Sequence, residues 1–583
     1  MRDFKYEIAE ALEEVEQIRD AGLDRAEVAG LLEVPSEPGY GDYSFPCFRL
    51  SKALRLPPQQ IAEAIAGDKD LVRLCPAIES VSAVHAYVNF SLKRGSLVKD
   101  VIKSVFARGD NFGSNDEGGG RTVIVEFSSP NIAKPFHIGH IRSTVIGNSI
   151  EHIYRHLGYK TIRLNHLGDY GTQFGKLIVA YRKWGNREDV EREPIATLQD
   201  LYVRFHKEAD TDPTLDDQAR KAFTRLEHGD PDEMELWKWF SDESLKEFNR
   251  VYDMLGISFD EYDGESFYSD KMPRFIGELK DKGLLKESKG AQIVDLSDFD
   301  MPAALVTKND GSTLYITRDI ATAVYRKEHY DFYKNLYVVA SQQNLHFKQL
   351  FKIVELLGYE WACDCVHIPF GLVSLEDGAL KTRYGNVVYL EDVLNAAVDR
   401  TRMIVLEKGV NADEADEIAR QVGIGAVIFN ELSASRIKDY VFSWDKVLNF
   451  DGETGPYVQY VYARAASVIR KAVEMGDPDP ELAFGGGSDF NAAYLTSDAA
   501  FDLAKLIHSF PDSVIMASER YEPSYVTRHI VDVAQAFNRF YHEETVLVDD
   551  ADERAARLAL VCAAKQVIGI GLSLLGIEAP EKM

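Results

Sequence analysis

The sequence predicts a multidomain α/β plus α protein: a split Rossmann-type parallel-sheet domain, an α+β N-terminal domain and an all-helical C-terminal domain. Three observations lead to this prediction. The chain has 583 residues, more than one hydrophobic core can organise, so several domains are expected. From residue 121 a strand, a helix and a second strand follow one another, which is the opening of a parallel nucleotide-binding sheet. After about residue 400 nearly all of the pattern is amphipathic helix.

The first expected domain, residues 1–112, is α+β. It opens with two amphipathic helical stretches and continues through the turn-rich residues 35–43. It ends on the alternating apolar and polar pattern of residues 83–92, which is typical of a strand. The polar, Gly-rich residues 113–120 are expected to form a linker to the next domain.

The second expected domain, residues 121–400, carries the parallel sheet. Its expected elements are strand 122–127, helix 138–152, strand 160–164, and the further strands 303–306, 336–340 and 366–369. Residues from about 180 to 295 turn charged and helical, which predicts an insertion into the sheet. The third domain, residues 401–583, is expected to be helical, interrupted by a flexible stretch at 484–488.

Composition limits the possible classes of protein. Hydrophobic residues make up 45%, ordinary for a soluble globular protein, and no apolar run looks long enough to span a bilayer. The first twenty residues are acidic and amphipathic, which is wrong for a signal or transit peptide, so we expect a cytoplasmic location. The five cysteines are scattered, and Cys363 and Cys365 have no second ligand pair. We therefore expect neither a disulfide framework nor a metal site.

The most informative segment is residues 126–140, an apolar strand followed by a Pro-bounded turn and two histidines. His137 and His140 fall at the start of the expected helix, where free N–H groups and the positive dipole end favour phosphate. Gly139 permits close approach, and imidazoles can donate to oxygens that gain charge during phosphoryl displacement. On this pattern alone, a nucleotide site and a pair of structural histidines both remain open.

Motifs along almost the whole chain then match one family. His137-Ile-Gly-His140 is the HIGH signature of class I aminoacyl-tRNA synthetases, and its surroundings resemble the arginyl-tRNA synthetases. The other matching stretches are residues 129–135, 141–144, 165–175, 314–319, 341–346, 455–460 and 575–583. The resemblance implies activation of arginine with ATP-Mg²⁺ as a substrate complex, arginyl transfer to tRNA(Arg), and no tightly bound cofactor or structural zinc. It also suggests that activation needs bound tRNA.

The resemblance also gives roles to the domains. It implies an N-terminal domain that binds the tRNA elbow, a catalytic domain with a connective insertion, and a helical domain for stem contact and anticodon binding. Tyr87 and Asn89 match elbow-contact positions, where a ring stacks on a base and an amide pairs with its edge. A plain half-buried strand is the alternative. Tyr541 and Met583 match positions that border the anticodon pocket, although aromatic stripes on helices usually belong to a core.

An arginine pocket is implied at five positions. The matching residues are Glu126, Asn131, Tyr315, Asp319 and Gln343. A guanidinium is planar with five donors, so it selects carboxylates or neutral acceptors, and a substrate without those donors leaves buried acceptors unpaired. For Asp319 the alternative is a salt bridge to Arg318 or Arg326, and for Tyr315 it is ordinary core packing.

The second ATP-binding segment departs from the superfamily. Class I enzymes carry KMSKS there, but the aligned residues 379–383 are Ala-Leu-Lys-Thr-Arg, so neither motif lysine position holds lysine. Lys381 and Arg383 are the cations left to meet phosphate, and His346 is expected to approach the nucleotide. Lys134, just before the HIGH motif, is the expected substitute for the missing lysines. A solvated loop lysine is the alternative.

The overall charge argues against RNA binding as a property of the whole surface. A net charge of −28 and a pI near 5 are the opposite of the basic footprint of most nucleic-acid binders, so any RNA contact has to be local. We expect tRNA(Arg), L-arginine and ATP as partners, no DNA, no membrane, and a monomer. Two alternatives stay open: another nucleotidylyltransferase with the same H-x-G-H helix, and a non-catalytic RNA-binding relative.

Overall fold

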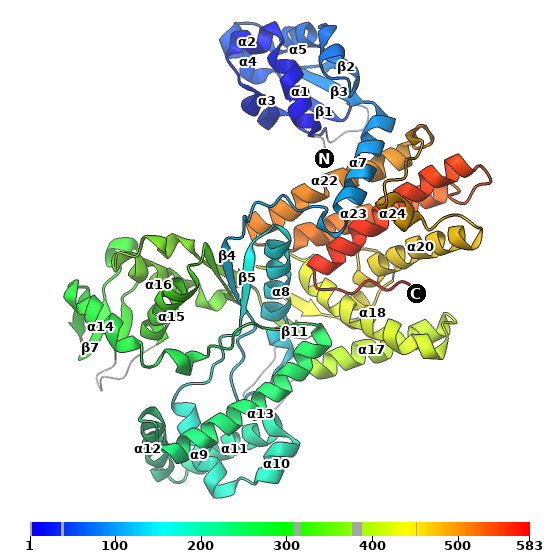
Figure 1. The fold of residues 1–583 in the computed structure, drawn as a ribbon. Helices are drawn as coiled ribbons and strands as arrows, with labels where there is room; N and C mark the ends of the chain where they lie inside the picture. The colour runs from blue at the N-terminus through cyan, green and yellow to red at the C-terminus, as the bar shows by residue number, and fades with distance from the viewer. Residues whose placement is uncertain (1–2, 36–39, 308–314, 376–387, 451) are drawn as a thin grey trace. The chain divides into compact units, whose positions relative to one another are not determined.

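The computed structural model describes residues 3–35, 40–307, 315–375, 388–450 and 452–583 (Figure 1). The chain forms two compact units, each assembled from separate stretches of sequence. Unit 1 comprises Met1–Phe112, Arg464–Phe510 and Asp532–Ile568, and unit 2 comprises Gly113–Ala463, Pro511–Val531 and Gly569–Met583. Unit 2 contains both the parallel sheet and the histidine pair.

Unit 2 is built around a four-stranded parallel sheet. Its strands are β4 (Thr122–Glu126), β5 (Lys160–Leu164), β9 (Lys334–Ala340) and β10 (Cys365–Phe370), in the order β10-β9-β4-β5. From β4 the chain passes through α8 (Ile141–His156) to β5, and from β9 it passes through α16 (Asn344–Leu356) to β10. The two crossovers lead in opposite directions, so a topological switch point lies between the carboxyl ends of β4 and β9.

The predicted strands at 122–127 and 160–164 are confirmed, and their packing explains the sequence. β4 is buried on both faces, which is why its residues form a continuous β-branched run. The expected linker packs against the end of α8: the N–H of Gly118 donates to the carbonyl of Leu157, and the N–H of Gly120 donates to that of Gly158. This segment therefore belongs to the edge of the sheet domain.

The charged segment predicted as an insertion forms a group of helices and a small second sheet. The helices are α9 (Thr172–Trp184), α10 (Arg187–Arg192), α11 (Pro194–Ala209), α12 (Thr214–Glu227), α13 (Pro231–Leu255) and α14 (Met272–Asp281). The strands β6 (Leu285–Ser288), β7 (Ala291–Val294) and β8 (Ala304–Thr307) form an antiparallel sheet of their own. The prediction that residues 303–306 resume the parallel sheet was wrong, because periodicity identifies a strand but not its partner.

Further helices and a two-stranded parallel pair complete unit 2. They are α15 (Tyr315–Tyr330), β11 (Val373–Leu375), α17 (Leu390–Glu407), α18 (Ala412–Ser433), β12 (Tyr440–Phe442), α19 (Trp444–Val447) and the first part of α20 (Gly455–Glu474). Residues Ile320, Ala321 and Val324 of α15 pack in the same buried core as Ile124 of β4. That core fixes the first turns of α15 and α16 near the end of β9.

Unit 1 begins with a three-stranded antiparallel sheet and short helices. The strands are β1 (Tyr43–Pro46), β2 (Ile78–Val84) and β3 (Tyr87–Leu92), in the order β1-β3-β2. The helices are α1 (Phe4–Glu13), α2 (Glu16–Ala21), α3 (Arg25–Leu31), α4 (Phe48–Leu54), α5 (Pro58–Ala66) and α6 (Asp70–Leu74). The single strand predicted at 83–92 was wrong: His85 has a left-handed φ of 54°, and the chain turns there between β2 and β3.

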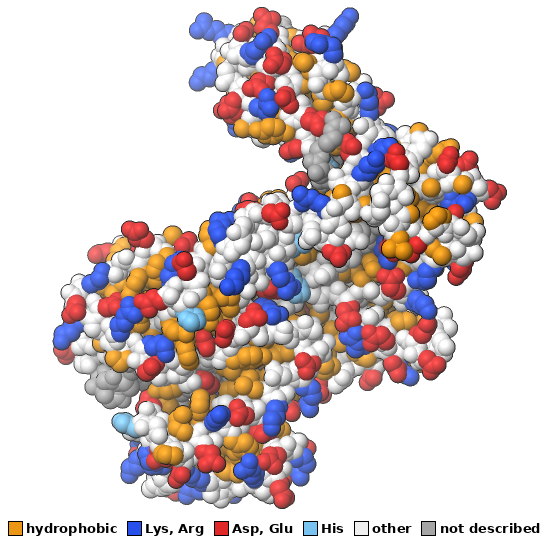
Figure 2. Space-filling view, viewed as in Figure 1, with side chains coloured by type: hydrophobic (Ala, Val, Ile, Leu, Met, Phe, Trp, Pro, Cys, Tyr) orange, Lys and Arg blue, Asp and Glu red, His pale blue; other side chains and the backbone are white. Residues whose placement is uncertain are grey.

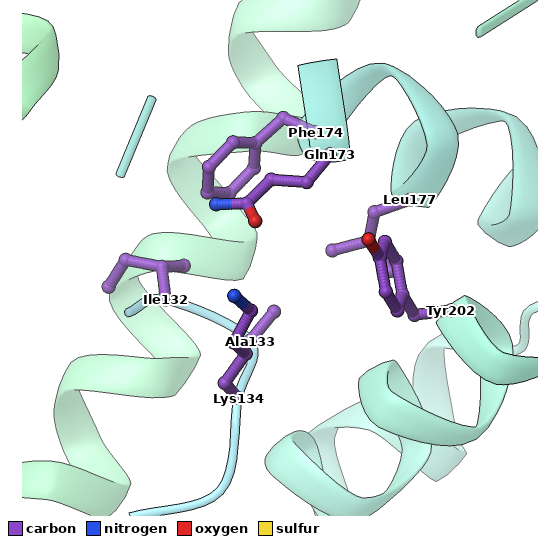
Figure 3. A pocket seen from close by; sticks show the side chains of 7 residues that line it. All are labelled: Ile132, Ala133, Lys134, Gln173, Phe174, Leu177 and Tyr202. Carbon is purple, nitrogen blue, oxygen red and sulfur yellow. The ribbon is translucent and has the colours of Figure 1, made fainter. Parts of the chain in front are cut away.

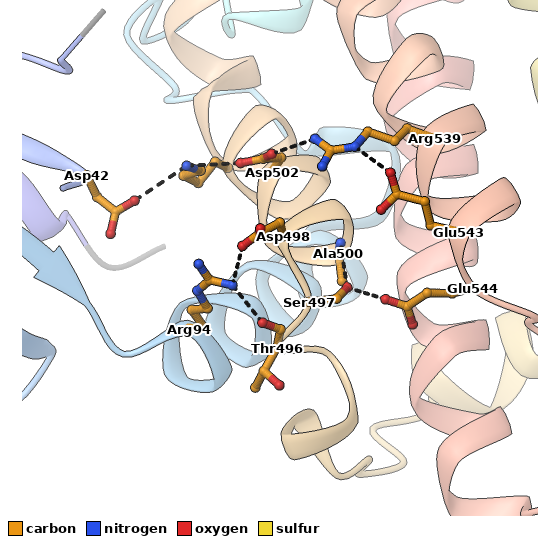
Figure 4. A network of polar contacts seen from close by, with 11 residues as sticks. Asp42, Arg94, Thr496, Ser497, Asp498, Ala500, Asp502, Arg539, Glu543 and Glu544 are labelled. Carbon is orange, nitrogen blue, oxygen red and sulfur yellow. Dashed lines mark hydrogen bonds and ion pairs between the residues drawn. The ribbon is translucent and has the colours of Figure 1, made fainter. Parts of the chain in front are cut away.

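The rest of unit 1 is a helical bundle, as predicted for the C-terminal region. It contains α7 (Arg94–Arg108), α21 (Pro480–Gly485) and parts of α20, α22 (Asp498–Arg520), α23 (Ser524–Glu543) and α24 (Ala551–Leu574). Ion pairs lie along its surface (Figure 4): Arg94 meets Asp498 at 2.7 Å, and Arg539 bridges Asp502 and Glu543. Exposed pairs of this kind contribute roughly 0–1 kcal/mol each, so the apolar core dominates stability.

One helix corrects the prediction that no apolar run can span a membrane. By length and composition α24 is apolar enough to do so, the single such helix in the part of the chain that the structure describes. However, 78% of its apolar window is buried inside the protein, and residues such as Leu560, Val561 and Ile568 have no exposed surface. A helix that is apolar all round is expected at the centre of a bundle, which is where α24 lies.

Candidate active site

The parallel sheet brings separate motifs to one edge. β4 ends at Glu126 and runs into the loop that carries His137, while β9 ends at Ala340 and runs into the turn that carries Gln343. The two strands are neighbours in the sheet. Ligands of open α/β sheets bind in the crevice at such a switch point, so the topology by itself locates the candidate site.

The histidine pair caps the short helical turn that leads into α8. Nδ1 of His137 accepts the N–H of Gly139 at 3.1 Å, and the N–H of His137 donates to Nδ1 of His140 at 3.1 Å. The ring centroids are 4.1 Å apart. Because Nδ1 of His137 is an acceptor, the neutral ring carries its proton on Nε2, which is therefore a hydrogen-bond donor.

Burial lowers the pKa of both imidazoles. The pKa of His140 falls to about 3, because desolvation, the neighbouring His137 and the charge of Lys134 all disfavour its cation. Desolvation also lowers the pKa of His137. At pH 7 the pair is therefore neutral, and it can offer hydrogen bonds to a phosphate without adding charge.

The loop between β4 and the histidines has an uncommon backbone. Ser128, Ser129 and Ala133 have positive φ values of 68°, 49° and 58°. Each such residue costs on the order of 1–3 kcal/mol and needs support from its surroundings. The N–H of Ser128 donates to Ser143 Oγ at 3.0 Å, and the N–H of Ala133 donates to Ser244 Oγ at 3.1 Å. Since Ser244 lies on α13, the insertion helps to shape this loop.

Asn131, predicted to help bind the substrate backbone, lies in the same loop beside Gly168. The two residues form a parallel bridge, and the N–H of Ile132 donates to the carbonyl of Gly168 at 3.2 Å. A Cβ at position 168 would lie 2.3 Å from the side-chain oxygen of Asn131, so glycine is required there. The motif at residues 165–175 therefore has a packing role: it leaves room for Asn131.

Two residues predicted for different ligands meet directly. Asp319 of α15 lies 2.5 Å from Nε2 of His346 in the first turn of α16. Desolvation acts to lower the pKa of His346, but the hydrogen bond and charge of Asp319 outweigh it, and the pKa is raised. Tyr315 is 65% exposed, so it is not a core residue, and Gln343 is exposed as well. A guanidinium could therefore reach these side chains.

Arg318 and Arg326, the alternative partners predicted for Asp319, pair with other carboxylates. Arg326 is fully buried and lies 2.5 Å from Glu126, and Arg318 lies 2.6 Å from Glu265. Among the described side chains, Asp319 is therefore paired with His346 and not with either arginine. Glu126, predicted for the pocket, shares its charge with Arg326. Coulombic attraction to Glu126 and its hydrogen bond outweigh desolvation and raise the pKa of Arg326.

Sequence analysis missed Glu265 and Ser244, and it named Arg326 only as an alternative partner of Asp319. Their partners lie far along the chain, and no local spacing connects the members of these pairs. One weak signal existed: Arg318 and Arg326 flank the mostly apolar residues Ile320 to Val324 of one helix, and a buried arginine needs a carboxylate partner. That signal predicts an acidic partner without identifying it.

Lys134 lies in a small pocket between the histidine loop and the insertion (Figure 3). The pocket is lined by Ile132, Ala133, Lys134, Gln173, Phe174, Leu177 and Tyr202. The amine points toward the amide of Gln173 (Figure 3). Desolvation lowers the pKa of Lys134, opposed by the charge of Glu265. Lys134 is thus a half-buried cation whose charge reaches His140, which does not fit a solvated loop lysine.

The predicted cations of the second ATP-binding segment, Lys381 and Arg383, lie outside the described residues. The chain that follows them is attached to the histidine segment, because Tyr389 pairs with His137 in an antiparallel bridge. The described residues contain no group of three or more His, Cys, Asp or Glu side chains that could hold a metal ion.

In unit 1, the predicted elbow-contact residues differ in exposure. Tyr87 is half-buried at the start of β3, with its ring 5.5 Å from the ring of Phe48, which is 54% exposed. Asn89 is buried, and its side-chain oxygen accepts the hydroxyl of Ser44 at 2.7 Å. The aromatic surface of Tyr87 and Phe48 faces solvent, whereas the Asn89 amide oxygen already has a partner inside the sheet.

The residues predicted for anticodon binding are each described in their own unit. In unit 1, Tyr541 is half-buried on α23, stacked on Phe537 at 6.3 Å and with the guanidinium of Arg464 at 5.4 Å from its ring. In unit 2, Met583 packs at the edge of a cluster formed by α17 and α18. On the face shown in Figure 2, basic side chains are interspersed with acidic ones.

A parallel sheet with a HIGH histidine pair at its switch point, interrupted by a helical insertion, defines a class I aminoacyl-tRNA synthetase. Family models agree with this class. The chain matches "tRNA synthetases class I (R), catalytic domain" over residues 102–444, "Arginyl tRNA synthetase N terminal domain" over residues 2–92, and "DALR anticodon binding domain" over residues 458–583.

Full-length relatives narrow the class to one family. The chain is 54% identical to an arginine–tRNA ligase of Clostridioides difficile (strain 630) and 52% identical to one of Halothermothrix orenii, covering 100% of each chain. Its fold matches the solved Thermus thermophilus arginyl-tRNA synthetase (TM-score 0.79, 24% identity, 100% of both chains). It also matches that of Plasmodium falciparum (TM-score 0.77, 24% identity, 99% and 98% covered). The chain belongs to the arginyl-tRNA synthetase family, as its motifs predicted.

Proposed function

We propose that this protein activates L-arginine with ATP and transfers it to the 3′-terminal adenosine of tRNA(Arg). One observation carries the proposal: two groups of side chains that suit ligands of opposite charge lie at the same edge of the sheet. Neutral histidine donors open α8, and Asp319 stands beside His346 where α15 and α16 meet. The first group suits a phosphate chain, and the second suits a cationic side chain.

The first step is formation of arginyl-adenylate. A carboxylate oxygen of arginine attacks the α-phosphorus of ATP, an oxygen–phosphorus bond forms, the bond to the β-phosphate bridge breaks, and pyrophosphate leaves. This step needs positioning and charge stabilisation, with no protein nucleophile. His137 and His140 donate to phosphate oxygens, Gly139 allows close approach, and Lys134 supplies positive charge. ATP enters as its Mg²⁺ complex, so the metal belongs to the substrate.

Arginine recognition rests on matching acceptors to a five-donor guanidinium. Asp319 accepts from the guanidinium, Glu126, Tyr315 and Gln343 line the same pocket, and Asn131 helps to hold the backbone end of the substrate. His346 and the guanidinium compete for the same Asp319 carboxylate, because the imidazole is already 2.5 Å away. Once released, His346 is free to meet the nucleotide.

The second step transfers the arginyl group to tRNA. A ribose hydroxyl of the terminal adenosine attacks the carbonyl carbon, an ester forms, and AMP leaves. Tyr87 stacks on an elbow base, with Asn89 beside it in β3, and Tyr541 and Met583 each contribute to anticodon recognition. Lys381 and Arg383 assist ATP binding from the second segment. We place this activity in the cytoplasm, in a monomer without a DNA or membrane partner.

Aminoacylation of total tRNA, measured with each of the twenty amino acids in turn, tests the proposal. We expect arginine alone to be attached, and only to arginine-accepting tRNA. Attachment of a different amino acid would show that arginine is not the substrate. Absence of any charging, with nucleotide transfer to a small molecule instead, would favour a nucleotidylyltransferase.

A further inference from the structure

Arg142 is a buried charge that the reaction described above does not use. It lies in the first turn of α8, and only 1% of its side chain is exposed. Its Nη1 donates to two carbonyl oxygens from distant parts of the chain, that of Gly371 at 3.0 Å and that of Lys438 at 2.7 Å. One side chain on the histidine helix therefore holds two other segments of unit 2.

The first of these segments comes directly after the sheet strand β10, and the chain continues from it toward the second ATP-binding segment. Gly371 follows β10 and precedes β11, and its N–H donates to the carbonyl of Arg436 at 2.8 Å. A Cβ at position 371 would lie 2.6 Å from the carbonyl carbon of Lys438. The backbone at Gly371 is thus packed too tightly against Lys438 for any residue but glycine, and Arg142 donates hydrogen bonds to the carbonyls of both residues.

The carboxyl group that approaches Arg142 belongs to Glu431 of α18, and burial raises the pKa of this carboxyl to about 8. The Nε of Arg142 lies 3.6 Å from Glu431, whose side chain has no exposed surface, and its guanidinium lies 5.3 Å from the ring of Tyr440. Desolvation lowers the pKa of Arg142, opposed by the charges of Glu431, Asp439 and Glu522. A buried charge of this kind is costly unless hydrogen bonds satisfy its donors. Both carbonyls accept from one atom, Nη1, while Nε on the other side of the guanidinium faces Glu431. A lysine ammonium is a compact point charge and does not span this distance in the same way.

The chain on the other side of residues 376–387 is fixed to the same helix start. The N–H of Ile138 donates to the carbonyl of Val388 at 3.1 Å, and the N–H of Leu390 donates to the carbonyl of Phe136 at 3.0 Å. Both described flanks of that stretch are therefore tied to residues 136–142. Backbone hydrogen bonds hold the downstream flank at Val388 and Leu390, and the side chain of Arg142 holds the upstream flank at Gly371.

We propose that Arg142 is a positioning residue for adenylate formation, which fixes Gly371 relative to the HIGH histidines. The inference rests on the proposed function, because it assumes that ATP binds at the carboxyl edge of the sheet, where Gly371 follows β10 and the histidines precede α8. Catalysis by positioning is sensitive to small displacements: a shift of about 1 Å can lower the rate by roughly 10²-fold. Loss of Arg142 should therefore slow the chemical step while arginine binding, which uses α15 and α16, is preserved.

The test is ATP–pyrophosphate exchange in the presence of tRNA, with active sites counted by the adenylate burst. We compare Arg142→Met, Arg142→Lys and the control Arg155→Met, which changes a 53% exposed arginine on the same helix. We expect kcat per active site to fall about 10²-fold in Arg142→Met with the arginine KM nearly unchanged, and to recover in part in Arg142→Lys. Arg155→Met should behave like the unmodified protein.

A double variant covers the case in which Arg142→Met does not fold because Glu431 is left unpaired. Arg142→Met/Glu431→Met replaces the buried pair by apolar side chains of similar volume, a change that proteins often tolerate. We expect it to fold and to show the same loss of kcat. A folded variant without the guanidinium whose kcat stays within about threefold of the unmodified protein would overturn the proposal, as would failure of the double variant to fold. If the unmodified protein does not activate arginine, the proposed function fails instead.

Discussion

The two ends of the candidate site use histidine in opposite electrostatic settings. His137 and His140 are half-buried, no carboxylate of the described residues contributes to their pKa shifts, and desolvation lowers both pKa values. At His346, the hydrogen bond to Asp319 outweighs desolvation and raises the pKa. The same side chain is thus kept neutral at one end and charged more readily at the other.

Under the proposed function, this difference lets one site bind a polyanion and a cation together. At the proposed phosphate end, neutral imidazoles donate hydrogen bonds, and Lys134 supplies the positive charge. At the proposed arginine end, the Asp319 carboxylate must stay available, and a titratable imidazole is its partner until a guanidinium binds. A permanently charged arginine at that position would compete with the substrate at every pH. Arg318 and Arg326 are instead held by Glu265 and Glu126.

The largest expected effect is at the phosphate end, from Lys134→Ala. If Lys134 replaces the missing motif lysines, kcat for adenylate formation should fall roughly 10²–10³-fold with little change in the arginine KM, the pattern of an interaction made mainly in the transition state. Single-turnover adenylate formation measures this. Lys381→Ala is the matched control and should lose less. Near-normal activity in Lys134→Ala, or a larger loss in the control, would assign the neutralisation of phosphate charge to the second ATP-binding segment, residues 379–383.

At the arginine end, Asp319→Asn should weaken arginine use far more than ATP use. The change removes a charge-assisted partner from a buried guanidinium, worth about 2–4 kcal/mol. Separate KM values for arginine and ATP, from pyrophosphate exchange, give the comparison. Equal losses for the two substrates would contradict the assignment of Asp319 to the arginine end.

A smaller effect is expected in unit 1, from Tyr87→Ala. Loss of base stacking, about 1–3 kcal/mol, should raise the tRNA KM while arginine affinity stays nearly constant. Ser44→Ala, which removes the partner of Asn89 without touching the exposed ring, is a suitable control in the same sheet. An unaltered tRNA KM in Tyr87→Ala would assign Tyr87 to packing.

The smallest expected effect is the pH dependence of arginine binding. The raised pKa of His346 means that its pairing with Asp319 stabilises the free site below the ordinary histidine pKa and is lost as pH rises through the raised value. A guanidinium must displace the protonated ring at low pH, so the arginine KM should fall as pH rises across that range. His346→Asn should remove this dependence of the arginine KM on pH. A KM independent of pH in the unmodified protein would show that Asp319 and His346 are not competing partners.

Local pattern was enough to predict the centre of the fold. The β-branched run before Glu126 and the helix after His140 are β4 and α8, because burial on both faces and helical spacing leave direct marks in sequence. Pairing between distant elements leaves no such mark. For that reason the partner of residues 303–306 and the turn at His85 were predicted wrongly.

The same limit applies to the site. Motifs identified the side chains at the sheet edge, but not which ones touch. The contacts between Asp319 and His346, between Glu126 and Arg326, and between Arg142 and Gly371 depend on helix crossings that only packing decides. The pKa directions follow from those contacts and from burial, so they too could not be predicted from the sequence.

The most direct test of the account is ATP–pyrophosphate exchange with arginine and with citrulline, each with tRNA present. Citrulline has nearly the same shape but lacks the positive charge and two-sided donor pattern that Asp319 is proposed to bind. The account predicts exchange with arginine and rejection of citrulline. Activation of citrulline at a rate near that of arginine would contradict it.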